Sequence, residues 1–173
     1  MEKIITGHVY CCGDNIVAYD ILPLERKTTG GMDRNFLGQY ALEGIDPEFA
    51  AKARSGEYNV VIGGINFGGG AKSIEHPVHA LLGANIEVVI AKSMARYFFR
   101  NAINNGLPVV TCDNVTEFFK TGDEIRIDLS TAEIENLTTG QKISGVPLDD
   151  QARSILEVGG LINFTKKQLQ ERK

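Results

Sequence analysis

Residues 59–111 read NVVIGGINFGGGAKSIEHPVHALLGANIEVVIAKSMARYFFRNAINNGLPVVT, and this stretch decides the fold. Three short apolar segments have the length and composition of buried strands: 59–65, 87–91 and 107–111. Two helical segments separate them: 74–84 and 94–105. This alternation of strands and helices predicts a βαβ core with parallel strands. We expect Ser93 to cap the second helix and Gly106 to end it, because these residue types favour those positions.

The segments before this core are less regular. Residues 3–12 predict a strand, and residues 13–15 form a turn after it. An apolar segment over 16–22 ends at Pro23. Residues 24–35 are polar and rich in glycine, which predicts a mobile loop.

A short helix is predicted to start at Asp46-Pro47 and to end near Arg54, with Asp46 as its cap. After the core, three short alternating segments predict an antiparallel meander: 124–129, 133–138 and 141–146. A helix from Asp149 or Asp150 to Val158, a break at Gly159-Gly160 and a short amphipathic helix complete the chain. The sequence therefore predicts an α/β fold that forms one domain over residues 1–173.

Composition and charge exclude several classes of protein. The chain has 173 residues, 43% of them hydrophobic, and a net charge of -4, so it lacks the basic stripe of a nucleic-acid binder. The first residues do not resemble a signal peptide, and no apolar run approaches the roughly 20 residues of a membrane span. Cys11, Cys12 and Cys112 form neither a CxxC pair nor a disulfide framework. We expect buried free thiols, no metal site in this chain and a reducing cytoplasm.

The glycine-rich segment 66–76, NFGGGAKSIEH, lies between a predicted strand and a predicted helix. Such a loop presents backbone N–H groups and the positive end of a helix to an anion, and glycine lets a ligand approach the backbone. The spacing is neither that of a Walker loop nor GxGxxG. The residues alone predict an anionic small-molecule site, or a loop that needs glycine only for its turn.

Longer matches give a more specific assignment. Asn66–His76 resembles the active-site loop of the isopropylmalate isomerase small subunits, and 91–108, AKSMARYFFRNAINNGLP, resembles the same family almost residue for residue. Further matches are 13–16 (GDNI), 21–23 (ILP) and 159–162 (GGLI). The whole chain is thus similar to the 3-isopropylmalate dehydratase small subunits of the aconitase superfamily.

This resemblance implies the swivelling β/β/α fold of the last aconitase domain. It implies a large subunit as partner, in a heterodimer or heterotetramer, which holds a [4Fe–4S] cluster that acts as a Lewis acid; this chain would bind no cofactor. The small subunit would supply a serine base, backbone amides and an arginine that grips a carboxylate. The implied reaction is a dehydration and rehydration of a hydroxy di- or tricarboxylate, and 3-isopropylmalate would place it in leucine biosynthesis.

The loop departs from the usual family pattern, NFGCGSSREH, because it is one residue longer. Aligned from the left, Ala71 stands at the base serine and Ser73 at the arginine. Aligned from the right, Lys72 stands at the base serine and Ile74 at the arginine, and Ser73 matches the second serine. Upstream, the usual Asp-Thr-Asp is replaced by Val17-Ala18-Tyr19.

Three roles for the loop follow. Ser73 is the base and Lys72 replaces the arginine; or Lys72 is the base, if burial favours its neutral form; or the chain is a non-catalytic regulatory or binding module. Ser73 is alternatively a plain helix cap. In the catalytic readings we expect the substrate to contact the backbone of Gly69, Gly70 and Ala71.

Other positively charged residues are candidates for weaker roles. Arg26 resembles, loosely, the arginine of the family loop that contacts the variable group of the substrate, and it is otherwise a solvated loop charge. Arg96 and Arg100 are expected to be structural or to face the partner subunit. The altered loop makes a homocitrate-type acid or a methylated malate an alternative to 3-isopropylmalate.

Overall fold

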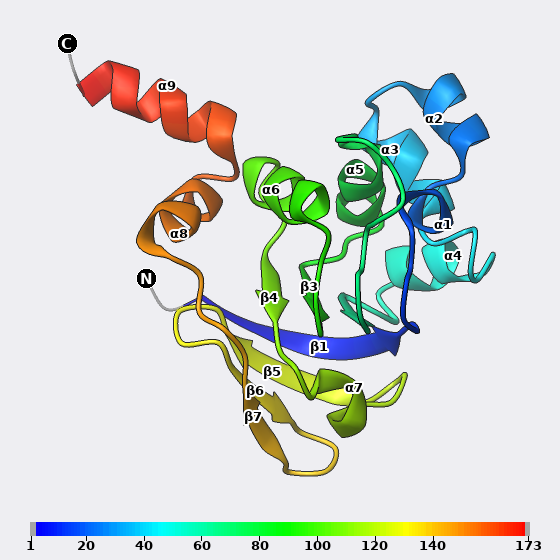
Figure 1. Cartoon of the computed structure of the whole chain (residues 1–173), viewed down its shortest axis with the longest axis vertical. Helices are drawn as coiled ribbons and strands as arrows, with labels where there is room; N and C mark the ends of the chain where they lie inside the picture. Colours follow the sequence, from blue (N-terminus) through cyan, green and yellow to red (C-terminus); the bar gives the residue numbers. More distant parts are fainter. Residues whose placement is uncertain (1–2, 172–173) are drawn as a thin grey trace.

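Seven strands form one sheet in the order β4-β3-β2-β1-β5-β6-β7 in the computed structural model, which describes residues 3–171 (Figure 1). The parallel strands are β1 (Ile4–Cys11), β2 (Val60–Gly63), β3 (Val88–Ala91) and β4 (Val109–Thr111). The antiparallel strands are β5 (Glu124–Asp128), β6 (Glu133–Asn136) and β7 (Lys142–Ser144). The predicted parallel core and antiparallel meander are both confirmed.

Strand β1 belongs to both parts of the sheet. Its first residues, Ile4 to His8, pair with β5, and its last residues, Val9 to Cys11, pair with β2. Between them the side chain of Asn59 accepts a hydrogen bond from the His8 N–H and donates one to the Thr6 carbonyl. A Cβ atom at Gly7 would lie 1.8 Å from the Asn59 side chain, so only glycine fits this crossing.

Helices lie on one side of the parallel strands. They are α1 (Ala18–Ile21), α2 (Leu24–Gly30), α3 (Arg34–Leu37), η1 (Gly38–Tyr40), α4 (Phe49–Arg54), α5 (His76–Gly83), α6 (Arg96–Asn104), α8 (Asp150–Glu157) and α9 (Leu161–Glu171). All of them except α2 and α9 bury residues there. The core between them and the sheet includes Ile21, Leu37, Phe49, Leu81 and Leu107. Strands β2 and β3 are buried along their whole length, as is usual for parallel strands covered on both faces.

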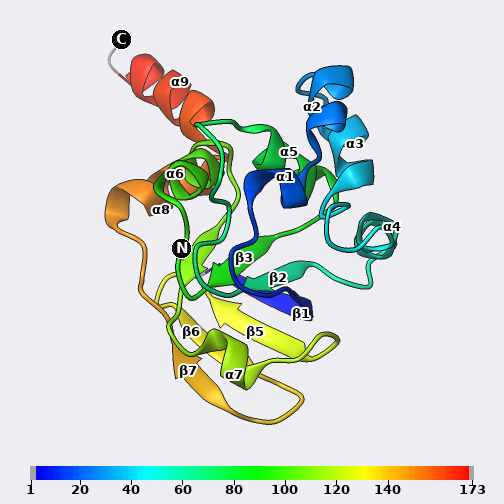
Figure 2. The ribbon, with the colours of Figure 1, turned by 45° about the vertical axis from the view of Figure 1, so that its right-hand side comes forward.

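The second face of the parallel strands packs on the antiparallel part and on α7 (Val115–Phe118), as Figure 2 shows. Val61 of β2 points to the helices, whereas its neighbours Val60 and Ile62 join this second core together with Ile125 and Ile127 of β5. Because successive side chains of a strand point to opposite faces of the sheet, alternate residues of β2 belong to two different hydrophobic cores. The layers are β/β/α, as the family resemblance implied.

The predicted mobile loop over 24–35 was wrong. Residues 24–30 form α2 and residues 34–37 form α3, which Asp33 caps by accepting hydrogen bonds from the Asn35 and Phe36 N–H groups. Helix α2 has no buried residue, so it lacks the apolar periodicity by which a helix is predicted. Its Arg26 instead forms a salt bridge with Glu43, a residue distant in sequence.

Two predicted helix starts also need correction. Helix α4 begins at Phe49, because the Asp46 side chain accepts from the Glu48 N–H and holds a turn before the helix. Helix α6 begins at Arg96, and Ser93 does not cap it. The Ser93 hydroxyl instead accepts a hydrogen bond of 2.8 Å from the Asn66 N–H, so it ties two loops together.

The C-terminal helices α8 and α9 follow the predicted break at Gly159-Gly160. Helix α9 extends away from the sheet and has no buried residue (Figure 1). Within residues 3–171, no helix is long and apolar enough to cross a membrane. The three cysteines are free thiols, as predicted, although Cys11 is only partly buried.

Candidate active site

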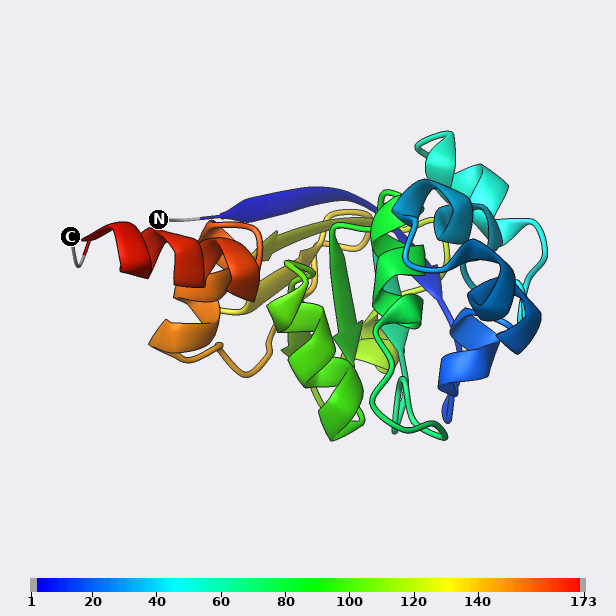
Figure 3. The same cartoon turned by 90° about the horizontal axis from the view of Figure 1, so that it is seen from above.

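The glycine-rich loop between β2 and α5 lies at the carboxyl edge of the parallel strands. Figure 3 shows this loop beside the segment that follows β1 and the start of α6. Two hydrogen bonds join the loop to the first of these segments: the Gly68 N–H donates to the Ile16 carbonyl at 2.7 Å, and the Ala18 N–H donates to the Gly69 carbonyl at 2.8 Å. Ligands of α/β folds bind at this edge, because loops from several strands meet there.

The first half of the loop, which we define as residues 66–69, is anchored on both sides. On one side it bonds to the segment after β1, as described above. On the other side the Phe67 N–H donates to the Ser93 carbonyl at 3.0 Å, and the Phe67 carbonyl accepts from the Ala95 N–H at 2.9 Å. Gly68 has a φ of 79°, and a Cβ atom there would lie 2.4 Å from the Phe98 ring. Glycine is therefore required both by conformation and by packing.

The second half, residues 70–73, is open to solvent. Gly70, Lys72 and Ser73 are exposed and Ala71 is half-buried. Within the part of the chain that the structure describes, no group accepts a hydrogen bond from the N–H of Ala71, Lys72 or Ser73. These donors lie just before α5, whose first turn also leaves N–H groups without partners in the helix. The arrangement suits an anionic ligand.

Ser73 is not the cap of α5. The capping position belongs to Glu75, which makes no side-chain capping bond. The Ser73 hydroxyl instead lies 3.4 Å from Nδ2 of Asn101, a buried residue of α6. The same Nδ2 donates to the Ile74 carbonyl at 2.9 Å. Sequence reasoning missed Asn101, although an asparagine on the buried face of an amphipathic helix is itself a signal of a specific polar contact.

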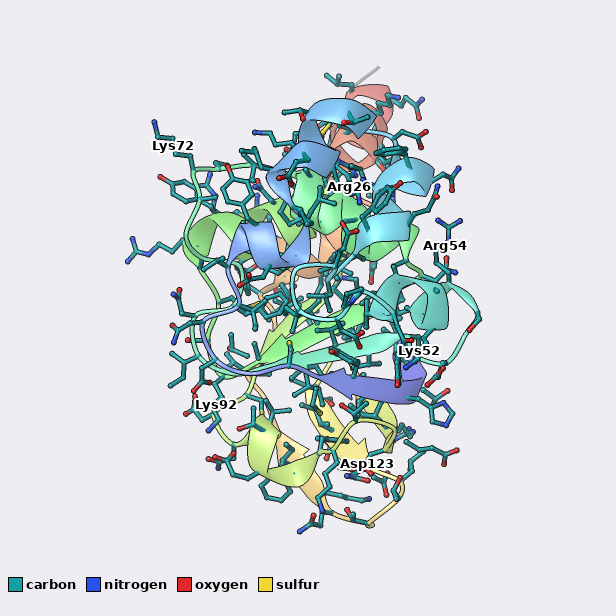
Figure 4. All side chains as sticks on the ribbon, turned by 90° about the vertical axis from the view of Figure 1, so that its right-hand side faces the viewer. Arg26, Lys52, Arg54, Lys72, Lys92 and Asp123 are labelled. Carbon is teal, nitrogen blue, oxygen red and sulfur yellow. The ribbon has the colours of Figure 1, made fainter. Side chains whose placement is uncertain are left out.

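Lys72 extends outward from the molecule in Figure 4. Lys72 is exposed in this chain, whereas the role of Lys72 as the base assumed a buried side chain. Gly69 is buried, and its carbonyl accepts a hydrogen bond from the Ala18 N–H. Gly70 and Ala71 belong to the open half. The structure thus brings Lys72, Ser73 and the free backbone donors into one exposed arc.

Two histidines lie behind this arc. The Arg34 Nε donates to Nδ1 of His79 at 2.9 Å, and Nε2 of His79 lies 3.7 Å from a Glu75 oxygen. Burial, and then the charge of Arg34, lower the pKa of His79 below its ordinary value. Burial and the nearby Lys27 lower the pKa of His76, whose buried Nδ1 has no hydrogen-bond partner among the described residues.

Arg26 is engaged with residues of its own neighbourhood. Its guanidinium forms two hydrogen bonds to the Glu43 carboxylate, at 2.9 and 3.0 Å, and lies 4.0 Å from the centre of the Tyr40 ring. The hydrogen bond to Glu43 raises the pKa of Arg26. Figure 4 shows Arg26 on the N-terminal helices, apart from Lys72. Arg96 and Arg100 are exposed on α6.

The described residues do not offer the set of ligands that an iron–sulfur cluster needs. Over residues 3–171, no three side chains of His, Cys, Asp or Glu are grouped so as to hold a metal ion. Burial raises the pKa of Cys11 to about 11 and that of Cys12 to about 12, so both thiols are held in the protonated form, which is a poor metal ligand.

Comparison with known proteins supports the fold and the loop together. Residues 16–114 match the family described as the aconitase C-terminal domain. The chain is 47% identical to the 3-isopropylmalate dehydratase small subunit of Methanosarcina acetivorans, over 96% of this chain and 99% of that one. It is 42% identical to the isopropylmalate/citramalate isomerase small subunit of Methanocaldococcus jannaschii, over 99% of both.

A solved structure agrees with these matches. The crystal structure of 3-isopropylmalate dehydratase from Methanocaldococcus jannaschii superposes with a TM-score of 0.90 at 35% identity, and the match covers 98% of each chain. The β/β/α architecture and the resemblance to this family are thereby confirmed. The chain belongs to the aconitase C-terminal domain family, in which it is a hydro-lyase small subunit of the 3-isopropylmalate dehydratase type.

Proposed function

We propose that this chain is the catalytic small subunit of a heteromeric isomerase that dehydrates and rehydrates 3-isopropylmalate, in leucine biosynthesis. The open half of the loop carries the proposal. It places a serine hydroxyl, a lysine and unpaired backbone N–H groups together at the carboxyl edge of the sheet, in a chain whose near-full-length relatives are named for this reaction.

A methylated malate is the main alternative substrate. One relative that is 42% identical is named for citramalate as well as isopropylmalate. Both substrates are dicarboxylates with a hydroxyl group, and they differ mainly in the size of the apolar substituent. A homocitrate-type acid would add a third carboxylate, which needs a further cation near the loop; Arg26, committed to Glu43, does not offer one freely.

Each group of the loop has a proposed role. The deprotonated Ser73 oxygen takes the proton from the carbon next to a carboxylate and becomes a hydroxyl, and the electron pair left behind forms the double bond as hydroxide leaves the neighbouring carbon. The N–H groups of Gly70 and Ala71, with the Lys72 ammonium, hold a carboxylate. Gly69 orients the arc through its bond to Ala18. A [4Fe–4S] cluster of the large subunit would supply the Lewis acid that accepts the hydroxide.

We also propose that residues 1–173 act as one domain that swivels onto the large subunit. The continuous seven-stranded sheet supports this reading. The free thiols favour a reducing compartment, which we take to be the cytoplasm. The exposed face around Lys72, with Arg96 and Arg100 on α6, is the proposed contact face.

The decisive experiment is reconstitution with the large subunit of the same organism under anaerobic conditions. We expect turnover of 3-isopropylmalate, measured as absorbance of the unsaturated intermediate, and weaker or equal turnover of citramalate. A complex with an intact cluster that turns over none of a panel of hydroxy di- and tricarboxylates would overturn the proposal.

A non-catalytic regulatory or binding module is the second candidate. The observation that favours it is the absence of an arginine from the open half, where only Lys72 carries positive charge. If the complex is active but neither Ser73→Ala nor Lys72→Ala lowers its activity, the loop performs no chemistry and this candidate gains. If Ser73→Ala abolishes turnover while the complex stays intact, it is excluded.

A further inference from the structure

Asn101 of α6 is one of the few polar side chains that the fold buries. It is 7% exposed, and it lies in the helix directly behind the open half of the loop. Burying an amide is unfavourable unless its polar atoms find partners. Its Nδ2 atom finds two in the loop, the Ile74 carbonyl at 2.9 Å and the Ser73 hydroxyl at 3.4 Å. The helix therefore holds this amide at a defined position against Ser73.

The direction of the contact with Ser73 matters for chemistry. An amide N–H can only donate, so the serine oxygen is the acceptor and its own hydrogen points elsewhere. A donor directed at an oxygen stabilises the form in which that oxygen carries negative charge. Ser73 is thus the loop side chain whose deprotonated form the fold supports, whereas Lys72 has no buried partner of this kind.

We propose that Asn101 is the positioning residue of the reaction, and that it makes Ser73 rather than Lys72 the base. This inference rests on the proposed function, because it assumes that the complex abstracts a proton from a hydroxy acid. Asn101 does not touch the substrate. It acts through Ser73, by keeping the hydroxyl oxygen at one place on the arc and by favouring its deprotonated form.

A purely structural role is the competing explanation, since the bond to the Ile74 carbonyl would by itself hold the loop. The neighbouring residue Asn105 supplies a matched control. Asn105 follows the last residue of α6, its Nδ2 donates to the Asn101 carbonyl at 2.9 Å, and among the described residues none of its hydrogen bonds is to the loop. Asn105→Ala removes an amide of the same kind but leaves both contacts of the Asn101 side chain in place.

The test is a double-mutant cycle in the reconstituted complex with its large subunit. We expect Asn101→Ala to lower kcat by about tenfold to a hundredfold with KM within about twofold, and Asn105→Ala to change neither by more than about twofold. In a Ser73→Ala background, Asn101→Ala should have no further effect on kcat, because residues that act as a unit are not additive.

A second readout separates proton abstraction from loop structure. Exchange of the substrate's carbon-bound hydrogen with deuterated water reports the base step directly. We expect Asn101→Ala to slow this exchange as much as it slows turnover. If Asn101→Ala fails to fold, Asn101→Asp keeps the side-chain volume, removes the donor and should show the same loss.

Two outcomes would overturn the inference while the proposed function stands. One is an Asn101→Ala complex in which KM rises and the exchange rate is unchanged, as expected if the residue only supports the loop. The other is an additive cycle, in which Asn101→Ala lowers kcat by the same factor in the wild-type and in the Ser73→Ala background. A wild-type complex that turns over no hydroxy acid is a different result, because it contradicts the proposed function itself.

Discussion

The two halves of the glycine-rich loop differ in how the fold holds them. Residues 66–69 are bonded to the segment after β1 and to the segment after β3, and Phe67 and Gly68 are buried. Gly70, Lys72 and Ser73 are exposed and Ala71 is half-buried, and the N–H groups of Ala71, Lys72 and Ser73 have no acceptor among residues 3–171. The anchored half, NFGG, keeps most of the usual family pattern NFGC, whereas the open half, GAKS, contains positions at which the two alignments of the loop differ. A rigid frame thus carries a short arc whose chemistry can change at small cost to stability.

The largest effect is expected at the tip of the open half. Ser73→Ala should lower kcat/KM of the reconstituted complex by about 10²–10⁴, the range typical of a lost general base, with little change in the free energy of unfolding. Steady-state kinetics and urea unfolding of the same preparation measure both. Ser55→Ala, at an exposed serine whose hydroxyl donates to the Lys52 carbonyl, is the control and should leave kinetics unchanged. If Ser73→Ala lowers the free energy of unfolding by an amount that accounts for the lost activity, the open half supports the fold as the anchored half does.

The anchored half should respond in the opposite way. Gly68→Ala should lower the free energy of unfolding by about 2–3 kcal/mol, because the new Cβ overlaps the Phe98 ring and φ is positive. Urea unfolding of the isolated chain measures this. Gly56→Ala has the same sign of φ, 92°, but open space around it, so it should cost only about 1 kcal/mol. If both variants cost the same, packing against Phe98 contributes nothing.

Lys72 should affect binding more than chemistry. Lys72→Ala should raise KM for the dicarboxylate about tenfold and change kcat less, and Lys72→Arg should restore most of the affinity because charge is retained. Lys52→Ala is the control, since Lys52 pairs with Glu48 and lies on the opposite side of the view in Figure 4. A fall in kcat at constant KM would instead identify Lys72 as the base.

The polar layer behind the loop predicts a dependence of stability on pH. Burial and Arg34 lower the pKa of folded His79, so the unfolded chain takes up a proton first as pH falls. The contribution is present in full above the ordinary histidine pKa of about 6.5 and is lost as pH falls from there toward the lowered value. His79→Gln should flatten the fall in urea midpoint between roughly pH 7 and pH 5, relative to the wild type. An unchanged slope would show that other groups control it.

The smallest effect is expected at Arg26. Its salt bridge to Glu43 is only partly buried, so Arg26→Ala should change the free energy of unfolding less than either glycine variant. The local effect should be clearer: hydrogen exchange of the α2 amides should become faster, because α2 has no buried side chain to hold it. Glu43→Ala should give the same pattern. A large rise in KM on Arg26→Ala would mean that the guanidinium leaves Glu43 to bind substrate.

Local patterns predicted most of the secondary structure. The apolar runs that became β2, β3 and β4, the alternating segments of the meander and the glycine breaks at 106 and 159–160 are all encoded by residues close in sequence. The loop between β2 and α5 was also predicted from residues close in sequence, because its glycines follow directly on an apolar run. Helix α2 was missed because its stabilising partner, Glu43, lies 17 residues away from Arg26 and its own residues are polar.

The sequence by itself determined the order of strands and helices, the α/β class and the family, because these depend on hydrophobic periodicity, turn residues and contiguous motifs. Only the tertiary structure decided that Ser93 bonds to Asn66 rather than capping α6, that β1 is shared between two layers, and that Asn101 lies against Ser73. Each of these contacts joins residues more than 25 positions apart. Such contacts form only when the packing of whole helices and strands brings their ends together, and no local pattern records them.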